Sequence, residues 1–475
     1  MALESKRYFA RHAWIDGGWS ADVVLSVDEL GMWCDAQPNA PPDSRLSAIA
    51  LSGSVLPGLV NAHSHAFQRA IAGLTECRSS DAVAGADDDF WSWRSRMYSA
   101  ANRITPAQLE AIATFLYAEL LAGGYTQVCE FHYLHNDLHG KPYADSLEMS
   151  HALVRAAQAT GIGLTLLPTL YIRSGFGAAG LREDQRRFAS SPERVLQMAD
   201  RIAQQSPNRK RINAGIALHS LRAVDAPAIE EVAQQANRQN LAVHIHIAEQ
   251  KQEVADCIAH HGQRPIEWLL AHADVKSNWN LVHATHTTAK ELAGIQQSGA
   301  SVVICPSTEA NLGDGVFDYP GYAGQGGTWS VGSDSHVTRS WPEELRLLEY
   351  SQRLLHRKRN VAAGVSAQAS SAAALFESAL AGGRAATGLV VGGIAVGNRA
   401  DFLVLDHDAS ALVGVPPAQQ LDALVFSSPT AAFDQVFVSG KQVVRNGRAV
   451  GAGPAFDLWP GLANKFRTVM RELWR

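Results

Sequence analysis

Short apolar runs alternate with longer helix-forming stretches through the middle of the chain. Seven β-rich runs are separated by segments rich in Ala, Glu and Gln: YTQVCEFHY, IGLTLLPTLY, INAGIALHS, LAVHIHIAE, NLVHAT, ASVVICPS and TWSVGSDSH. This alternation is typical of repeated βα units and predicts a parallel sheet. A helix is predicted at residues 105–123, with Thr105 as N-cap, Pro106 at the first position, Gln108 at the capping-box position and Gly123 at the end.

The β-rich runs share a polarity. Apolar residues come first in each run, and His, Glu, Asp or Ser gathers at its carboxyl end. For a single run, the polar residues could simply mark where the strand leaves the core. Their recurrence in all seven favours a functional reason, because the active site of a closed βα barrel is built at the carboxyl ends of its strands. We therefore expect an α/β fold with a (β/α)8 barrel.

The two ends of the chain differ from the middle. Residues 1–56 and 391–451 contain short alternating segments with turn residues, including the hairpin signals SGK and NGR. We expect these ends to form one small β-sandwich-like domain beside a barrel of residues 57–390. Residues 452–475 are expected to be a helical segment that ends in an amphipathic helix.

Composition narrows the classes of function. The net charge of −5 comes from 41 basic and 46 acidic residues without long runs, so neither nucleic acid nor a membrane surface is an expected partner. The first residues have no apolar core of a secretory signal, and a cytoplasmic location is expected. The five cysteines are odd in number and contain no Cys-x-x-Cys pair. A disulfide framework and a thiolate zinc site are therefore not indicated, and any metal must be held by nitrogen and oxygen.

Two runs carry closely spaced histidines. In PGLVNAHSHAFQR, His63 and His65 are one residue apart at the end of an apolar run, and on a strand they share a face. Two such imidazoles can chelate one divalent ion, although an isolated pair is often only surface or hydrogen-bonded. LAVHIHIAEQ adds His244 and His246 on one face, with Glu249 three residues further on. This run supplies a further ligand and a proton carrier.

Two later strand ends complete the candidate site. NLVHATH contributes His283 and WSVGSDSH contributes Asp334. A metal site with room for water is predicted from His63, His65, His246 and Asp334, and Glu249 and His283 remain free to move protons. Each residue also has a simpler interpretation. His244 could pack in the barrel or orient a ligand, His286 could be a loop residue, and Asp334 could cap the following helix.

Several motifs resemble the amidohydrolase superfamily. HSH, HIHIAE, VHAT and SDSH carry the resemblance, which covers nearly the whole chain and includes GNRADFLVLD near its end. HSHAFQRAIAGL, FWSWR, EFHYLH, LHSLRAV and CPSTEANLGDG are similar to the branch whose members convert N-formimidoyl-L-glutamate and water to N-formyl-L-glutamate and ammonia in histidine degradation. Ser307 stands where that branch suggests threonine. The resemblance implies a hydrolase that acts on the C–N bond of a linear amidine.

The resemblance also implies roles for individual residues and a cofactor. It implies one divalent metal, Zn²⁺, because the strands IGLTLLPTLY and INAGIALHS lack the lysine that bridges two metals in relatives. The metal ligands would be His63, His65, His246 and Asp334. The catalytic residues would be Glu249, His283 and Asp334. The substrate, a small dicarboxylate, would be bound by Gln68, Arg94, Tyr133, His219 and Arg222. We also expect a homodimer.

Two other functions are compatible with the same motifs. The first is a deaminase or chlorohydrolase that acts on a purine, pterin or triazine; Arg94 and Arg222 argue against it, because a neutral heterocycle does not need two cations. Both arginines could instead be solvated surface charges. The second alternative is a barrel that has lost catalysis, and the complete set of expected ligands together with Glu249 argues against it.

Overall fold

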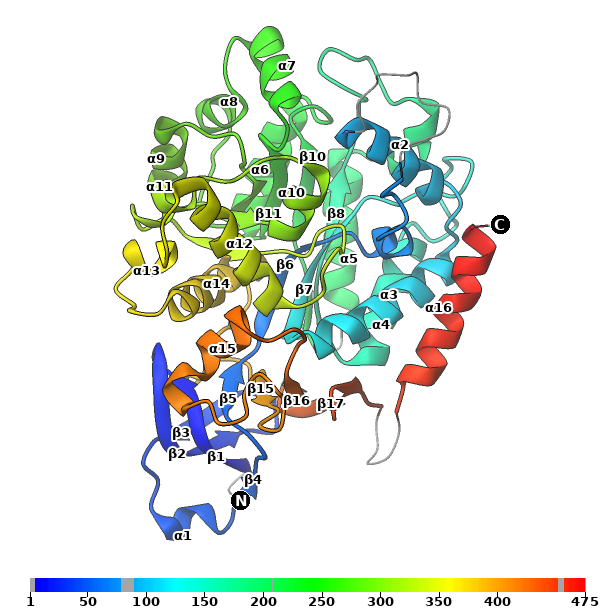
Figure 1. The fold of residues 1–475 in the computed structure, drawn as a ribbon. Helices are drawn as coiled ribbons and strands as arrows, with labels where there is room; N and C mark the ends of the chain where they lie inside the picture. Colours follow the sequence, from blue (N-terminus) through cyan, green and yellow to red (C-terminus); the bar gives the residue numbers. More distant parts are fainter. Residues whose placement is uncertain (1–4, 78–88, 207, 452–456, 475) are drawn as a thin grey trace.

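The computed structural model describes residues 5–77, 89–206, 208–451 and 457–474. At its centre, eight parallel strands lie side by side in the order in which they occur along the chain (Figure 1). They are β6 (Leu59–Ser64), β7 (Tyr125–His132), β8 (Gly163–Leu170), β10 (Ile216–Ser220), β11 (Val243–Ile247), β12 (Trp279–His283), β13 (Ser301–Ile304) and β14 (Trp329–Val331). A short strand, β9 (Ile212–Ala214), also pairs with β8. The predicted parallel βα architecture is confirmed.

The barrel closes along a seam between its first and last strands. Ser64 forms a parallel bridge with Asp334. The backbone N–H of Asp334 donates to the carbonyl of His63 at 3.0 Å, and the N–H of His65 donates to the carbonyl of Asp334 at 3.3 Å. Gly332 permits this close approach, because a Cβ at that position would lie 2.6 Å from the Cβ of His63. The seam therefore brings the His-x-His pair next to Asp334.

Helices cover the outside of the barrel. The helix predicted at 105–123 is α3 (Pro106–Ala122), and its capping box is present, since Thr105 and Gln108 each accept a hydrogen bond from the backbone N–H of the other. The remaining helices of this region are α4 (Glu148–Thr160), α5 (Pro192–Gln205), α6 (Ala226–Gln239), α7 (Lys251–His261), α8 (Pro265–His272), α9 (Ala289–Ser298), α10 (Pro306–Leu312), α11 (Tyr319–Ala323), α12 (Trp341–His356), α13 (Val361–Gly364) and α14 (Ser371–Thr387).

Three further segments follow β6 and β8 at the carboxyl ends of the strands. They are the 3₁₀ helices η1 (Ala66–Ala70) and η2 (Glu183–Phe188) and the helix α2 (Phe90–Ala101). Asp89 caps α2 by accepting from the N–H groups of Trp91 and Ser92. In Figure 1, α2 lies at the same end of the barrel as α7 and α10. It is thereby placed to form part of the wall around the strand ends.

Both chain ends contribute to a second sheet, as predicted. Its strands run in the order β18-β17-β16-β15-β5-β1-β2-β3, with β4 added at β1. They are β1 (Lys6–Ile15), β2 (Gly18–Val27), β3 (Trp33–Gln37), β4 (Ile49–Ala50), β5 (Val55–Pro57), β15 (Phe402–Leu405), β16 (Phe433–Val438), β17 (Lys441–Arg445) and β18 (Arg448–Ala449). Three short helical segments accompany it: α1 (Pro42–Arg45), η3 (Pro417–Gln419) and α15 (Gln420–Phe426). Most pairings are antiparallel, and a separate apolar cluster forms the core of this domain.

The hairpin signals in the sequence are tight turns in the structure. Ser439 and Gly440 connect β16 to β17, and Asn446 and Gly447 connect β17 to β18. All four residues have φ between 50° and 68°. Positive φ at both central residues is the geometry of a type I′ turn, whose twist matches that of the flanking antiparallel strands.

The chain ends in the amphipathic helix predicted from the sequence. It is α16 (Trp459–Leu473), which runs beside α3 (Figure 1). The rings of Phe466 and Phe115 stack there with their centres 4.5 Å apart. Residues 1–4, 452–456 and 475 of the predicted terminal segments lie outside the described residues. Within the described part of the chain, no helix has both the length and the apolar character needed to cross a membrane.

A buried ion pair joins the β domain to the barrel. Arg399, 1% exposed, donates from Nε to the carboxylate of Asp401 at 2.9 Å. It also donates to the side-chain oxygen of Gln127 on β7 at 2.8 Å and to the carbonyl of Lys210 at 2.9 Å. Asp401 accepts a further hydrogen bond from the N–H of Ser439. The GNRADFLVLD segment therefore fixes how the terminal sheet sits on the barrel.

Removal of this arginine should destabilise the protein strongly. We expect Arg399→Leu to cost about 3–5 kcal/mol, because Asp401 is left as a buried charge without its partner. The loss is measured as a lower midpoint of thermal and denaturant unfolding. Arg448→Leu, which breaks an exposed pair with Asp457, is the matched control and should leave both midpoints unchanged. Equal midpoints for the two variants would contradict the interpretation.

Candidate metal centre and active site

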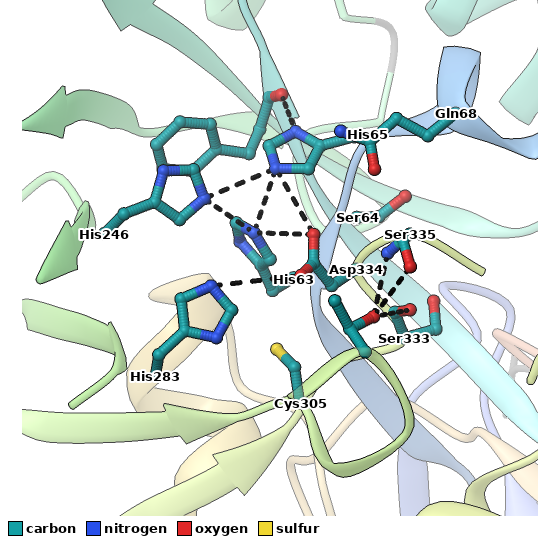
Figure 2. A network of polar contacts seen from close by, with 12 residues as sticks. His63, Ser64, His65, Gln68, His246, His283, Cys305, Ser333, Asp334 and Ser335 are labelled. Atoms are coloured by element: carbon teal, nitrogen blue, oxygen red, sulfur yellow. Dashed lines mark hydrogen bonds and ion pairs between the residues drawn. The ribbon is translucent and has the colours of Figure 1, made fainter. Parts of the chain in front are cut away.

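Three imidazoles and one carboxylate converge at the carboxyl ends of the barrel strands (Figure 2). The Nε2 atoms of His63, His65 and His246 lie 3.0–3.3 Å from one another. Asp334 Oδ1 lies 3.5 Å from Nε2 of His63 and 3.4 Å from Nε2 of His65. All four side chains are buried. The structure thus brings together the four residues that the sequence predicted as metal ligands.

The hydrogen bonds of the rings show which nitrogen is available for a metal. Nδ1 of His65 donates to the carbonyl of Phe131, and Nδ1 of His246 donates to the carbonyl of His219, both at 2.9 Å. A carbonyl oxygen only accepts, so each neutral ring has its proton on Nδ1 and an unprotonated lone pair on Nε2. Burial lowers the pKa of these rings, and lowers that of His63 to about 3, so they are neutral at pH 7.

Neutral rings with converging lone pairs need a cation between them. Nitrogen lone pairs 3.0–3.3 Å apart repel one another, whereas tetrahedral zinc with bonds of about 2.0–2.1 Å places its nitrogen ligands about 3.3 Å apart. Asp334 adds negative charge beside them. Burial alone raises the pKa of Asp334, but its interactions with His63, His65 and His283 together outweigh that effect and hold the pKa below its usual range. The donor set therefore fits one divalent cation.

Two groups able to move protons lie next to the ligand cluster. Nε2 of His283 is 4.0 Å from Glu249 Oε1 and 3.9 Å from Asp334 Oδ2. Burial raises the pKa of Glu249 to about 7, so this carboxyl group can hold and release a proton near neutral pH. The carboxylate of Glu253 accepts from the N–H groups of Ala248 and Glu249 and fixes the turn that carries Glu249.

Backbone geometry at the site is unusual. His283 and Asp334 have φ of 70° and 46°, in the left-handed region that non-glycine residues rarely adopt. His283 is the last residue of β12, and Asp334 lies three residues after the end of β14, where the chain turns toward the cavity. Such strained residues are typical of functional sites, because the surrounding structure must hold them in place.

The cluster lies at one side of a cavity at the carboxyl ends of the barrel strands. Every predicted site residue except His63 lines it: His65, Gln68, Arg94, Tyr133, His219, Arg222, His246, Glu249, His283 and Asp334. The sequence did not single out the other lining residues, namely Leu312 and, from α2, Phe90, Trp93, Met97 and Tyr98. Apolar side chains of a helix are ordinarily core residues, so only the motif FWSWR pointed to this element.

Two arginines face this cavity without a direct ion-pair partner, although Glu249 and Glu253 lie close enough to Arg222 to raise its pKa against the opposing effect of burial. The guanidinium of Arg94 lies 4.3 Å from the ring centre of Trp91 and 5.5 Å from that of Tyr98, and the guanidinium of Arg222 lies 5.6 Å from Trp91. Among the described residues neither guanidinium forms a hydrogen bond or an ion pair, and Nε of Arg222 is buried without a partner. Aromatic faces stabilise a cation without occupying its hydrogen-bond donors. These donors are therefore available to a carboxylate.

The other three predicted binding residues form one side of the same cavity. Gln68 donates to the hydroxyl of Tyr133 at 3.3 Å, and its own amide oxygen is buried without a partner. The ring of Tyr133 lies 5.1 Å from that of His65 and 5.5 Å from that of His219. Gln68, Tyr133 and His219 thus lie beside the ligand cluster.

The structure adds Glu130 and Glu309 as buried carboxylates that sequence reasoning missed. Glu130 accepts from the N–H of Ala66 at 2.6 Å and from the hydroxyl of Ser64 at 2.7 Å, which holds the chain on either side of His65. Glu309 Oε1 accepts from Nδ1 of His283 at 3.2 Å. A glutamate inside the otherwise uncharged run YTQVCEFHY was the available signal for Glu130.

The simpler interpretations of two predicted positions can now be compared with the structure. His244 donates from Nε2 to the carbonyl of Ala386 at 2.8 Å, so it packs against α14 and is not part of the ligand cluster. Asp334 does not cap the next helix, because α12 begins at Trp341 with Ser340 at the N-cap position. Asp334 instead lies in the seam and faces the histidines.

A (β/α)8 barrel with three imidazoles, a carboxylate and a buried glutamate at its strand ends defines a barrel hydrolase whose cluster fits a metal ion. The chain belongs to the amidohydrolase family, whose model matches residues 54–443. It is 45% identical over 445 residues to the formimidoylglutamate deiminase of Pseudomonas aeruginosa, covering 93% of this chain and 95% of that protein.

Solved structures show the same fold. An amidohydrolase from Brucella melitensis superposes with a TM-score of 0.90 and 40% identity, covering 99% of this chain and 100% of that one. An adenosine deaminase from Xanthomonas campestris, solved with bound zinc, superposes with a TM-score of 0.79 and 21% identity over 98% of each chain. The second similarity extends to the fold alone.

Proposed function

We propose that the protein hydrolyses N-formimidoyl-L-glutamate to N-formyl-L-glutamate and ammonia in histidine degradation. The observation that carries this proposal is the pair of arginines, Arg94 and Arg222, whose guanidinium donors lack a hydrogen-bond partner in the same cavity as the ligand cluster. The substrate has two carboxylates at one end and a formimino group at the other. The 45% identical Pseudomonas aeruginosa protein, whose name states this reaction, supports the same assignment.

The residues of the ligand cluster fit one divalent ion, and we propose Zn²⁺. His63, His65, His246 and Asp334 would hold it, since imidazole nitrogen with one carboxylate oxygen is a typical donor set for catalytic zinc. When bound, such an ion lowers the pKa of water from about 15.7 toward about 7 and polarises the atom to which it binds. No lysine occurs on β8, β9 or β10, which supports one metal rather than a bridged pair.

The proton carriers have separate tasks in the proposed reaction. Water adds to the formimino carbon, and Asp334 accepts a proton from that water. Both protons of the water pass to the imino nitrogen, the first as the water adds and the second as the hydroxyl of the adduct becomes the formyl C=O. Glu249, whose pKa burial raises to about 7, delivers them, and the C–N bond to that nitrogen breaks to release ammonia. His283 directs Nε2 toward the carboxyl groups of Glu249 and Asp334. From there it orients the reacting water as charge develops in the tetrahedral adduct.

Substrate recognition is assigned to the opposite side of the cavity. Arg94 and Arg222 each pair with a carboxylate, because guanidinium–carboxylate contacts are strong and directional. Gln68, Tyr133 and His219 contact the substrate between these cations and the ligand cluster. The two arginines thereby hold the formimino carbon close to Glu249 and His283.

The two alternatives explain the cavity less well. A deaminase or chlorohydrolase acting on a neutral heterocycle would leave the guanidinium donors of Arg94 and Arg222 without a carboxylate partner in the bound complex, and donors that lose water without gaining a partner are costly. A non-catalytic barrel has no need for converging lone pairs or for a glutamate whose pKa lies near 7. Three further expectations stay predictions: a homodimer, a cytoplasmic location and the absence of nucleic-acid or membrane partners. Light scattering measures the oligomeric state, and cell fractionation measures the location.

Charge recognition gives the test of the substrate. We expect Arg94→Met and Arg222→Met each to lower kcat/KM for N-formimidoyl-L-glutamate, because each leaves one carboxylate unpaired. The fall should correspond to a loss of about 2–5 kcal/mol in transition-state stabilisation. Metal content should not change, since neither residue is a ligand. Ammonia release is measured together with bound metal. Arg103→Met is the matched control and should behave as wild type. Arg103 is exposed and lies two residues after the end of α2, the helix that carries Arg94.

A substrate series separates these roles from a general loss of activity. Formimino compounds that lack one carboxylate should already be poor substrates and should lose little more in the matching variant. If both variants treat charged and uncharged substrates as wild type does, the glutamate assignment fails and the heterocycle deaminase moves ahead.

A further inference from the structure

Glu309 forms a buried hydrogen-bonded pair with His283. Its Oε1 accepts from Nδ1 of His283 at 3.2 Å and from the backbone N–H of Cys305 at 2.9 Å. Glu309 is 4% exposed and His283 is 1% exposed. Glu309 lies in the first turn of α10, after β13, whereas His283 ends β12, so the contact joins two neighbouring strand ends.

This hydrogen bond decides which nitrogen of His283 faces the cavity. A carboxylate has no proton to donate, so Nδ1 must donate, and whenever the ring is neutral its one proton is on Nδ1. Nε2 is then the atom left to interact with the reacting groups, and it lies 4.0 Å from Glu249 Oε1 and 3.9 Å from Asp334 Oδ2. Without the acceptor, the neutral ring could place its proton on either nitrogen and could rotate.

We propose that Glu309 is a positioning residue for the reaction, because it fixes the tautomer and orientation of His283 so that Nε2 faces Glu249 and Asp334. The inference rests on the proposed function, in which His283 orients the reacting water. Glu309 acts through His283, since it is absent from the residues that line the cavity. A carboxylate behind a histidine plays this orienting part in other hydrolases, where its loss gives the wrong tautomer.

A different interpretation of the same atoms is a second metal site. His283, Cys305 and Glu309 place one potential ligand atom each within 4.8 Å of one another. Glu309 Oε1 is, however, already used by two N–H donors, and His283 Nδ1 is one of them. A ring that donates from Nδ1 cannot ligate a metal through that atom. The hydrogen-bonded pair therefore accounts for the cluster.

The backbone contact to Cys305 makes two substitutions informative. In Glu309→Gln, the N–H of Cys305 should hold the amide oxygen in the position of Oε1, so an acceptor for His283 is kept while the charge is lost. In Glu309→Leu the acceptor is removed. We expect kcat for N-formimidoyl-L-glutamate to fall about 10²-fold or more in Glu309→Leu with little change in KM, and Glu309→Gln to recover at least about tenfold of that loss.

Both variants are assayed as holoenzymes with equal zinc content. A wild-type kcat in Glu309→Leu, or an effect on KM alone, would overturn the proposal. His283→Gln provides the second arm, because a residue that acts only through His283 should add no further loss in the double variant. Multiplying losses would show that Glu309 acts independently of His283. If Glu309→Leu does not fold, the same cycle is measured with Glu309→Gln.

Nitrogen-15 NMR of histidine-labelled protein reads the tautomer without an activity assay. The resonance missing from His283→Gln identifies the ring. We expect an Nδ1–H tautomer in wild type and in Glu309→Gln, and a mixture in Glu309→Leu; an unchanged tautomer in Glu309→Leu would sink the proposal. If wild type releases no ammonia from N-formimidoyl-L-glutamate, the proposed function fails, whereas the NMR result still decides the role of Glu309.

Discussion

Asp334→Ala is expected to lose both its bound metal and its activity. The three imidazoles converge through neutral Nε2 atoms, and Asp334 supplies the only carboxylate that the described structure places within 3.5 Å of those atoms. Removal of one of four donors leaves no spare ligand. We expect bound metal to fall well below one equivalent and ammonia release to fall by more than about 10⁴-fold, since both the ion and a proton acceptor are lost. His63→Ala should have the same outcome.

The measurement is metal analysis by mass spectrometry alongside the ammonia assay. Asp406, His407 and Asp408 form a surface group that could also bind a metal ion. Asp408→Ala is therefore the matched control: it should keep one equivalent and full activity, and any metal that it loses is adventitious. Full activity of wild type in a metal-free preparation would contradict the metal site altogether.

Local sequence patterns were sufficient for much of the fold, in the barrel and in the terminal sheet. The box of Thr105 and Gln108 delimits α3 because both hydrogen bonds of the box form within three residues. The turns at Ser439–Gly440 and Asn446–Gly447 are equally local, since a type I′ turn depends only on positive φ at two adjacent residues. Strand positions followed from apolar runs of the right length. None of these inferences needed knowledge of which strands are neighbours.

The candidate site was predictable for a different reason. His63, His65, His246, His283 and Asp334 all lie at strand ends, and a barrel brings its strand ends together. The strand-end positions were visible in the sequence, although the pairwise distances were not. The seam that sets the position of Asp334 depends on Gly332 beside His63, a contact between residues far apart in the chain.

What the sequence could not show are contacts that depend on neighbouring elements. Glu309 faces His283 only because β12 and β13 are adjacent and α10 turns back over them. Trp91 lies near Arg94 because both are on α2, but it lies near Arg222 only because α2 lies over the strand ends. A buried glutamate or tryptophan is by itself no sign of such a role, since the same residues serve ordinary packing. Side-chain partners across the barrel therefore required coordinates.

Glu249→Gln should separate proton transfer from metal binding. Glutamine keeps the size of the side chain but cannot titrate, so bound zinc should stay near one equivalent while kcat falls by about 10²–10⁴-fold. The variant should keep its fold, for a physical reason. Burial raises the pKa of Glu249 to about 7, above its ordinary value of 4.5, so its ionisation costs stability as pH rises through that range. The glutamine variant lacks this cost, and its melting temperature at pH 8 should equal or exceed that of wild type.

Kinetics and stability together decide the role of Glu249. Glu230→Gln, an exposed change on α6, is the matched control and should leave kcat, zinc and melting temperature unchanged. A slow Glu249→Gln enzyme with full zinc and an undiminished melting temperature is the signature of a lost proton carrier, because a structural carboxylate would lose stability when replaced. Unchanged turnover would instead make Glu249 a structural group just after β11. The proton for the departing nitrogen would then have to come from His283, whose Nε2 lies 4.0 Å from Glu249 Oε1.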